Sequence, residues 1–306
     1  MKNKSVLTKL SFIGILFILC SSIDAQTEFD GLFMSKNSFC LGTTAEISSF
    51  NRYWESEFNR DNANLGTVQY KALSVMGNYG LSDRLNVIFS VPYIHSQTSA
   101  GNLAGQNGIQ DASLWIKFQA LDKKFLNGNL QIIGFGGFSF PASNYNADFM
   151  PLSIGRGSNN ISTRLLLDYE ENNWYMTVSG AYIYRSNITL DRNTYYTDRM
   201  IYSNQVEIPN QYHYNTRFGY RNHQFIADIY HEYTNTLGGF DIPKNGMPFP
   251  SNEMDFQRLG FYTKIETPIS GLSFLVNGYT VFRGKNMGQL SGMQFGAFYI
   301  FGSSYN

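Results

Sequence analysis

The sequence has few cysteines, no excess of charge of either sign, and no long hydrophobic run after its first 25 residues. Cys20 lies in an apolar N-terminal stretch, so removal of that stretch leaves Cys40 alone and excludes an intramolecular disulfide. Without residues 1–25, the chain keeps 20 of its 23 basic and 22 of its 23 acidic residues. This balance argues against a nucleic-acid partner, because phosphate binding needs a basic surface.

The first 25 residues predict a cleavable secretory signal. Three lysines precede the apolar stretch "FIGILFILC", which is too short to span a bilayer, and small residues lead to a plausible cut after Ala25. An uncleaved anchor helix and lipoprotein processing at Cys20 are the alternatives. The second is disfavoured because Leu19 is bulky where that processing needs a small residue. We therefore expect an exported protein.

Aromatic residues are abundant in place of long apolar runs. They make up 16% of the chain, including 25 Phe and 21 Tyr, although the mean hydropathy is −0.25. No apolar window of 18 residues occurs after the signal, which excludes helical membrane spans. Twelve segments instead alternate apolar and polar residues, as strands with one apolar and one polar face do. These segments cover residues 41–54, 67–80, 84–96, 110–121, 128–141, 158–170, 173–187, 210–221, 223–236, 254–266, 271–284 and 290–301.

The connections between these segments alternate in length. Those after even-numbered segments are short, whereas those after the first five odd-numbered segments have about 12 to 22 residues. Short periplasmic turns and longer extracellular loops are typical of outer-membrane barrels. Lipid offers no hydrogen-bond partners, so strands cross it only as a closed barrel. The sequence therefore predicts an all-β fold: a single antiparallel up-and-down transmembrane β-barrel of about 12 strands, surrounded by lipid in the cell outer membrane.

Four regions follow from this pattern. We expect a signal peptide at 1–25, an N-terminal periplasmic or plug segment at 26–40, the outer-membrane β-barrel at 41–301 and a C-terminal tail at 302–306. The polarity of residues 26–40 does not decide between plugging the barrel and extending into the periplasm.

The last predicted strand carries the sequence "QFGAFYIF". It resembles the C-terminal insertion signal of bacterial outer-membrane barrels, with Gln294, Gly296, Tyr299 and Phe301 at the defining positions. The resemblance implies that the barrel assembly machinery is a partner during biogenesis. The alternative is an ordinary amphipathic strand.

Three stretches resemble the outer-membrane family named for the meta-pathway of phenol degradation. They are "YGLSDRLNVIFSVPY" at 79–93, "NGIQDASLWIKFQAL" at 107–121 and "GFGGFSFPAS" at 134–143. The resemblance implies a barrel of roughly twelve strands that passes small, often hydrophobic, molecules. It does not identify the substrate.

Twelve charged residues fall on the polar faces of the predicted strands. A charge facing lipid near the membrane midplane costs about 2–4 kcal/mol, so we expect these side chains to point inward. One hypothesis is that they line a narrow polar passage and tune what crosses it. The other is that they form an internal salt-bridged network that holds the barrel together. The residues are Glu46, Lys117, Arg164, Asp168, Arg185, Arg217, Asp228, Glu232, Arg258, Lys264, Glu266 and Arg283.

Catalysis and metal binding find little support in the sequence. Lipid-cleaving barrels need a His and a Ser close together on the outer face. Only His231 lies on an apolar face, and its neighbours on that face are Ile229 and Tyr233, with no Ser. The loop "DRNTYYTD" lacks the Gly and terminal Glu of a calcium loop. We expect no enzyme activity, no metal and no cofactor. The favoured function is passive transport of small molecules, and the alternative is a non-conducting barrel subunit bound to other outer-membrane proteins.

Overall fold

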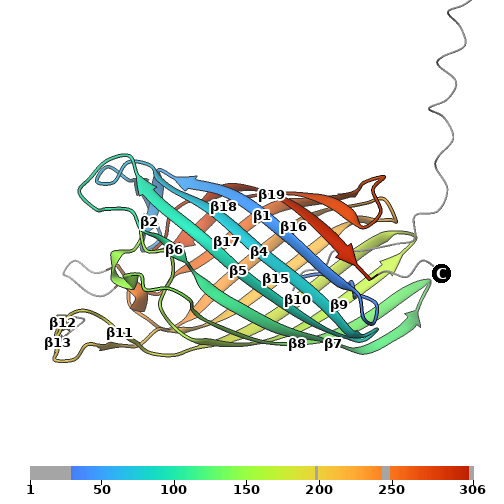
Figure 1. The fold of residues 1–306 in the computed structure, drawn as a ribbon. Helices are drawn as coiled ribbons and strands as arrows, with labels where there is room; N and C mark the ends of the chain where they lie inside the picture. Colours follow the sequence, from blue (N-terminus) through green and yellow to red (C-terminus); the bar gives the residue numbers. More distant parts are fainter. Residues whose placement is uncertain (1–28, 197–198, 243–248, 303–306) are drawn as a thin grey trace, which may run out of the picture.

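The computed structural model describes residues 29–196, 199–242 and 249–302. Twelve long antiparallel strands form a closed barrel (Figure 1), and this confirms the predicted fold class. The strands are β1 (Phe39–Phe50), β4 (Val68–Ser82), β5 (Leu85–Thr98), β7 (Asp111–Phe125), β8 (Gly128–Pro141), β9 (Asn160–Glu171), β10 (Trp174–Arg185), β15 (Asn210–Arg221), β16 (Phe225–Leu237), β17 (Asp255–Glu266), β18 (Leu272–Lys285) and β19 (Ser291–Phe301).

The first and last strands close the barrel. β1 pairs antiparallel with β19, in a register that runs from Phe39 opposite Phe301 to Ser49 opposite Ser291. On its other side β1 pairs with β4, and β4 pairs with β5. The ring therefore has no free edge, and neighbouring strands satisfy each other's backbone groups, as crossing a bilayer requires.

The two ends of the barrel differ as the loop lengths predict. Short turns join β4 to β5, β7 to β8, β9 to β10, β15 to β16 and β17 to β18 at one end, and the ends of β1 and β19 lie there too (Figure 1). We call this the periplasmic end. The longer connections gather at the extracellular end. They carry β2 (Arg52–Glu55), β3 (Phe58–Asp61), β6 (Asn107–Ile109), η1 (Ala147–Phe149), β11 (Ile188–Thr189), β12 (Tyr195–Tyr196), β13 (Met200–Ile201), β14 (Gln205–Val206) and η2 (Phe249–Ser251).

The first strand is shorter than its predicted range of 41–54. It ends at Phe50, and residues 52–55 pair instead with residues 58–61 in an extracellular hairpin. Ser56 in the hairpin turn has a φ of 54°, a conformation that turns of this kind use. Residues 51–57 contain no Gly or Pro, so the sequence carried no strong turn signal at this break.

The outer face of the barrel is apolar and has aromatic residues near both ends. Towards the extracellular end, Tyr182 and Tyr212 have ring centroids 5.4 Å apart. Towards the periplasmic end, Trp174 and Phe218 stack at 5.5 Å. Such belts place amphipathic rings at the two membrane–water boundaries. A closed barrel with this outer face belongs in the outer membrane, as predicted.

Some predicted regions lie outside the described residues. These are the signal peptide at 1–25, residues 26–28 of the N-terminal segment and all of the C-terminal tail except Gly302. No helix of the described ranges is long and apolar enough to cross a bilayer.

Candidate functional site in the barrel lumen

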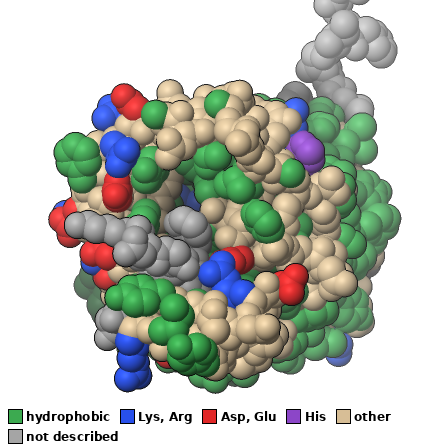
Figure 2. Space-filling view, turned by 90° about the vertical axis from the view of Figure 1, so that its left-hand side faces the viewer, with side chains coloured by type: hydrophobic (Ala, Val, Ile, Leu, Met, Phe, Trp, Pro, Cys, Tyr) green, Lys and Arg blue, Asp and Glu red, His purple; other side chains and the backbone are tan. Residues whose placement is uncertain are grey.

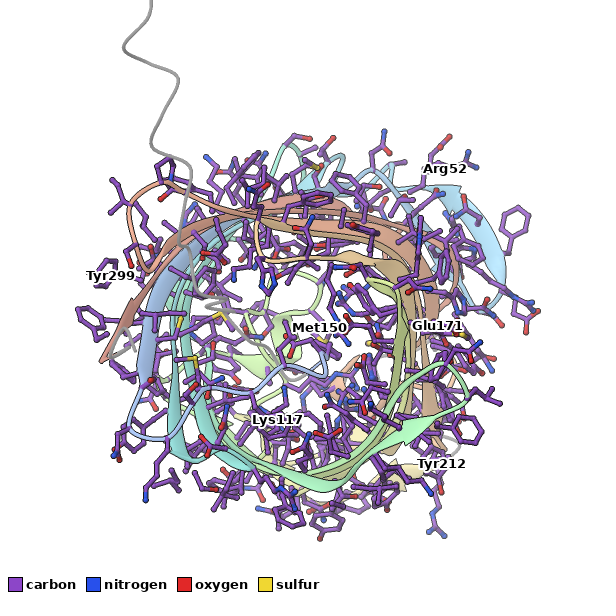
Figure 3. All side chains as sticks on the ribbon, turned by 90° about the vertical axis from the view of Figure 1, so that its right-hand side faces the viewer. Arg52, Lys117, Met150, Glu171, Tyr212 and Tyr299 are labelled. Atoms are coloured by element: carbon purple, nitrogen blue, oxygen red, sulfur yellow. The ribbon has the colours of Figure 1, made fainter. Side chains whose placement is uncertain are left out.

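The periplasmic half of the lumen holds the chain that precedes β1. Lys117 on β7 points into the barrel (Figure 3), and its side chain is fully buried. Its ammonium donates to the Asp30 carbonyl at 2.8 Å, to Asp30 Oδ1 at 2.9 Å and to the Leu32 carbonyl at 2.6 Å. The rings of Phe33 and Phe135 lie 4.8 and 5.5 Å from the same nitrogen. One lysine thus binds the N-terminal segment to the barrel wall.

The segment also packs closely against β9, which lies two strands from β7 in the ring. A Cβ atom at Gly31 would lie 2.5 Å from Asp168 Cγ on β9, so only glycine fits there without a shift. Further in, the Phe29 ring lies 4.3 Å from the Arg164 guanidinium and 5.7 Å from the His213 ring. Residues 29–34 therefore occupy space that an open lumen would leave to solvent.

Buried ion pairs surround this segment. Arg221 pairs with Asp168 and Glu170, and its guanidinium lies 4.5 Å from the Tyr175 ring. The Tyr175 hydroxyl donates to Asp228 at 2.5 Å. Asp228 in turn pairs with Arg217 at 3.2 Å. A cavity of only about 10 Å³ lies among these groups, Asp30 and Leu32, which is room for one water at most.

A second ion cluster, centred on Glu232, lies near the middle of the barrel. Glu232 accepts from His213 at 2.8 Å and pairs with Arg258 at 2.6 Å. The Arg258 guanidinium lies 4.8 Å from the Tyr279 ring, and the Tyr279 hydroxyl donates to Glu46 at 2.6 Å. These contacts link β15, β16, β17, β18 and β1 across the interior, and each acidic group has a donor.

The extracellular half is narrowed by the loop between β8 and β9, residues 142–159, which folds inward. In Figure 3, Met150 of this loop lies inside the ring of strands. The loop is held by hydrogen bonds from Tyr70 to the Pro151 carbonyl and from Ser96 to the Leu152 carbonyl, the latter at 2.5 Å. Leu152 is fully buried against Phe50 and Val68 of the β1–β4 region. The loop is thus a packed part of the interior.

Two cavities open beside this loop, in the end of the molecule that Figure 2 shows hollowed. They have volumes of about 530 and 570 Å³, and we call them chamber 1 and chamber 2. Both are lined by Arg156 of the inward loop and Arg185 of β10. Burial lowers the pKa of Arg156 to about 10, which leaves it charged at neutral pH.

The structure distributes the twelve predicted charged residues over these regions. Lys117, Arg164, Asp168, Arg217 and Asp228 surround the N-terminal segment, and Glu232 and Arg258 form the central cluster with Glu46 beside them. Lys264 and Glu266 pair with each other near the periplasmic end of β17. Arg185 lies apart from these groups, at the two chambers. Whether these residues line a passage stays a prediction.

Arg283 requires a correction, because it does not point inward. A β-bulge interrupts the pairing of β17 with β18, so that Gln257 lies opposite Arg283 whereas Arg258 lies opposite Val281. The extra residue shifts the alternation by one and moves Arg283 to the face of Gln257. That face is the outer one, where Gln257 lies 3.4 Å from His231, and Arg283 is exposed there.

Three important residues were absent from the predicted set. Arg221 continues the inward alternation of Arg217 and lies within the predicted segment 210–221, so the same pattern already marked it. His213 lies on the same polar face of β15 and carries the same alternation signal. Arg156 lies in a loop, and no periodic signal marks it.

The four residues of the predicted insertion signal divide between the two faces of β19. Tyr299 and Phe301 are exposed on the outer face, with ring centroids 4.7 Å apart (Figure 3 labels Tyr299). Gln294 points inward and donates to Thr44 at 3.2 Å, and Gly296 shares that face. This placement does not test recognition by the assembly machinery. Within the described part of the chain, no cluster of three or more His, Cys, Asp or Glu could hold a metal ion.

Comparison with protein-family models and with curated protein sequences finds no match. Among solved structures, an outer membrane channel from Pseudomonas putida F1 is similar over 91% of this chain and 100% of its own, with a TM-score of 0.71 and 12% identity. The translocator domain of the autotransporter NalP from Neisseria meningitidis matches 88% of this chain and 90% of its own, at a TM-score of 0.46 and 11% identity. The first likeness shows a shared fold; the second is too distant to support an argument.

Proposed function

We propose that this protein is an outer-membrane channel that passes small molecules, with a lumen that is closed at its periplasmic half in the described conformation. The observation that carries the proposal is the pair of chambers at the extracellular end, with volumes of about 530 and 570 Å³, which share the two arginines Arg156 and Arg185 in their walls. A purely structural barrel would gain stability from filling this space.

Passage requires the N-terminal segment to move. The cavity beside residues 30 and 32 measures only about 10 Å³, which is too small for an organic molecule while that segment is docked. The segment contacts the barrel wall through the polar contacts of Asp30 and Leu32 with Lys117 and through the apolar packing of Phe33 and Met34. We infer that undocking of residues 29–34 opens the lower half of the lumen.

The direct test is conductance of the purified protein in a planar lipid bilayer. Wild-type protein should give small or infrequent current steps, and deletion of residues 26–33 should give larger and longer ones. As a control for folding, the shortened protein should show the heat-modifiable migration of a folded barrel. Absence of current from both proteins would contradict the channel function.

The sequence resembles barrels that pass small and often hydrophobic molecules. The apolar residues of chamber 2 agree with a substrate of this kind. Phe50, Leu65, Leu103 and Phe256 all line that chamber. Liposomes containing the protein should take up small aromatic solutes faster than empty liposomes.

One observation favours the second candidate, a non-conducting subunit of an outer-membrane complex. The periplasmic half is filled by ion pairs and by the N-terminal segment, as expected for a barrel whose interior only provides stability. Extraction in mild detergent at native expression tests this candidate. Fixed companions in a complex without current in bilayers would support it, whereas a single barrel particle that conducts would exclude it.

A further inference from the structure

The two chambers differ in their charged residues. Chamber 1 is lined by two acids, Glu46 and Asp111, together with Arg156 and Arg185. Chamber 2 is lined by the same two arginines, and none of its lining residues in the described part of the chain is acidic. Chamber 2 is therefore lined by two positive charges and by no carboxylate that would compensate them.

Neither arginine of chamber 2 has an ion-pair partner among the described residues. Arg185 donates only to neutral acceptors, the Pro209 carbonyl at 3.2 Å and the Gln211 side chain. Arg156 donates from Nη2 to the Met254 sulfur at 3.3 Å, and its Nη1 is buried without a hydrogen-bond partner. A buried guanidinium with no carboxylate in contact is costly. The charge of Arg156 acts against that of Arg185 more strongly than Asp111, an acid of chamber 1, favours it. An anion placed between them would remove both penalties.

The remainder of chamber 2 is suited to an apolar group. Twelve of its twenty lining residues are aliphatic or aromatic, among them Phe50, Leu65, Leu103 and Met287. Its volume of about 570 Å³ lies within the range of small-molecule sites, which are mostly apolar with a few placed polar groups. Charge and apolar surface thus occur in one cavity, at different parts of its wall.

We infer that chamber 2 binds organic carboxylates that carry a hydrophobic tail, with the carboxylate on Arg156 and Arg185 and the tail against the apolar wall. Guanidinium groups suit this role because they donate two parallel hydrogen bonds to one carboxylate. The inference deepens the proposed channel function by naming a substrate class, but binding itself does not require conduction.

The test is isothermal titration calorimetry of the full mature protein in lipid nanodiscs, with 4-phenylbutyrate as the probe and empty nanodiscs as the blank. Two analogues with the same tail serve as ligand controls, the neutral 4-phenylbutanol and the cationic 4-phenylbutylamine. The acid should bind saturably and at least tenfold more tightly than either analogue. Acetate, which lacks the tail, should bind at least tenfold more weakly than the acid, because it buries little apolar surface.

Variants assign the binding to the chamber. Arg156→Met should weaken binding of the acid about tenfold or more, since hydrogen bonds between charged groups are worth more than neutral ones. Arg156→Lys should retain part of the affinity. Arg52→Met, in the exposed β2–β3 hairpin outside the barrel (Figure 3), is the matched control and should change nothing.

Two outcomes would overturn the inference: equal binding of acid and alcohol, or equal binding by wild-type protein and Arg156→Met. Arg185→Met is a second variant, and Arg156→Lys keeps the test valid if either methionine variant fails to fold. Saturable binding by a protein that gives no current would support this site and contradict the channel function. Current without selective binding of the acid would support the channel function and contradict this site.

Discussion

Replacing Lys117 by methionine is expected to release the N-terminal segment from the lumen. Methionine has a similar length and fills the same space, but it cannot donate to Asp30 or to the Leu32 carbonyl. The substitution therefore leaves a carboxylate and two carbonyl groups without the ammonium that binds them at 2.6–2.9 Å. Because the side chain of Lys117 is completely buried, water cannot take its place without rearrangement.

The size of the effect follows from these contacts. Removing one partner of a buried ion pair costs about 3–5 kcal/mol. The barrel keeps all of its strand pairing, so this cost falls mainly on docking of residues 29–34. Since about 1.4 kcal/mol corresponds to a tenfold change, the undocked population should rise roughly 100- to 4,000-fold.

Thiol labelling measures this population directly. A cysteine introduced by Leu32→Cys reacts with a bulky maleimide only when the segment leaves the lumen, so the labelling rate follows the undocked fraction. Background from Cys40 is low because it is 2% exposed. The rate should rise by two orders of magnitude or more in Lys117→Met, with longer openings in bilayer recordings.

Lys124→Met is the matched control, because Lys124 lies on the same strand and is exposed. It should label as slowly as the Leu32→Cys parent. A rate for Lys117→Met within twofold of the parent, in protein that still migrates as a folded barrel, would refute the conclusion that Lys117 holds the segment.

Three further predictions concern the barrel itself. Glu232→Gln should lower the free energy of unfolding by about 3–5 kcal/mol in urea titrations, because Arg258 loses the buried negative charge that compensates it; an unchanged midpoint would contradict this. Ile229→Arg, at an outer-face position that is 66% exposed, should cost about 2–4 kcal/mol in the same assay in lipid, and Ile229→Leu should be nearly neutral. Deleting Phe301 should abolish heat-modifiable barrel in the membrane fraction, and normal assembly would show that the insertion signal is not needed.

The sequence alone predicted the barrel because strands can cross a lipid bilayer only as part of a closed barrel. Each crossing segment must alternate apolar and polar residues, and every backbone group must be paired. Short turns lie on the periplasmic side of the membrane and longer loops on the extracellular side. The segments at 128–141 and 210–221 coincide with β8 and β15 for this reason. The same alternation placed Lys117 and Glu232 on the inner face, since period two is a property of the strand itself.

Local pattern failed where the chain leaves strict alternation. A single extra residue at the bulge beside Gln257 moved Arg283 to the outer face, and bulges leave no periodic mark in the sequence. The break after Phe50 was missed because residues 51–57 contain no Gly or Pro to mark a turn.

The tertiary structure alone decided what fills the lumen. Nothing in residues 29–34 signals that they dock on Lys117, 83 or more positions away, and nothing in loop 142–159 brings Arg156 to Arg185. These contacts join segments remote in sequence, and they form only after the barrel has closed around them. Alternation determines which side chains face inward, but the partners they meet there depend on three-dimensional packing.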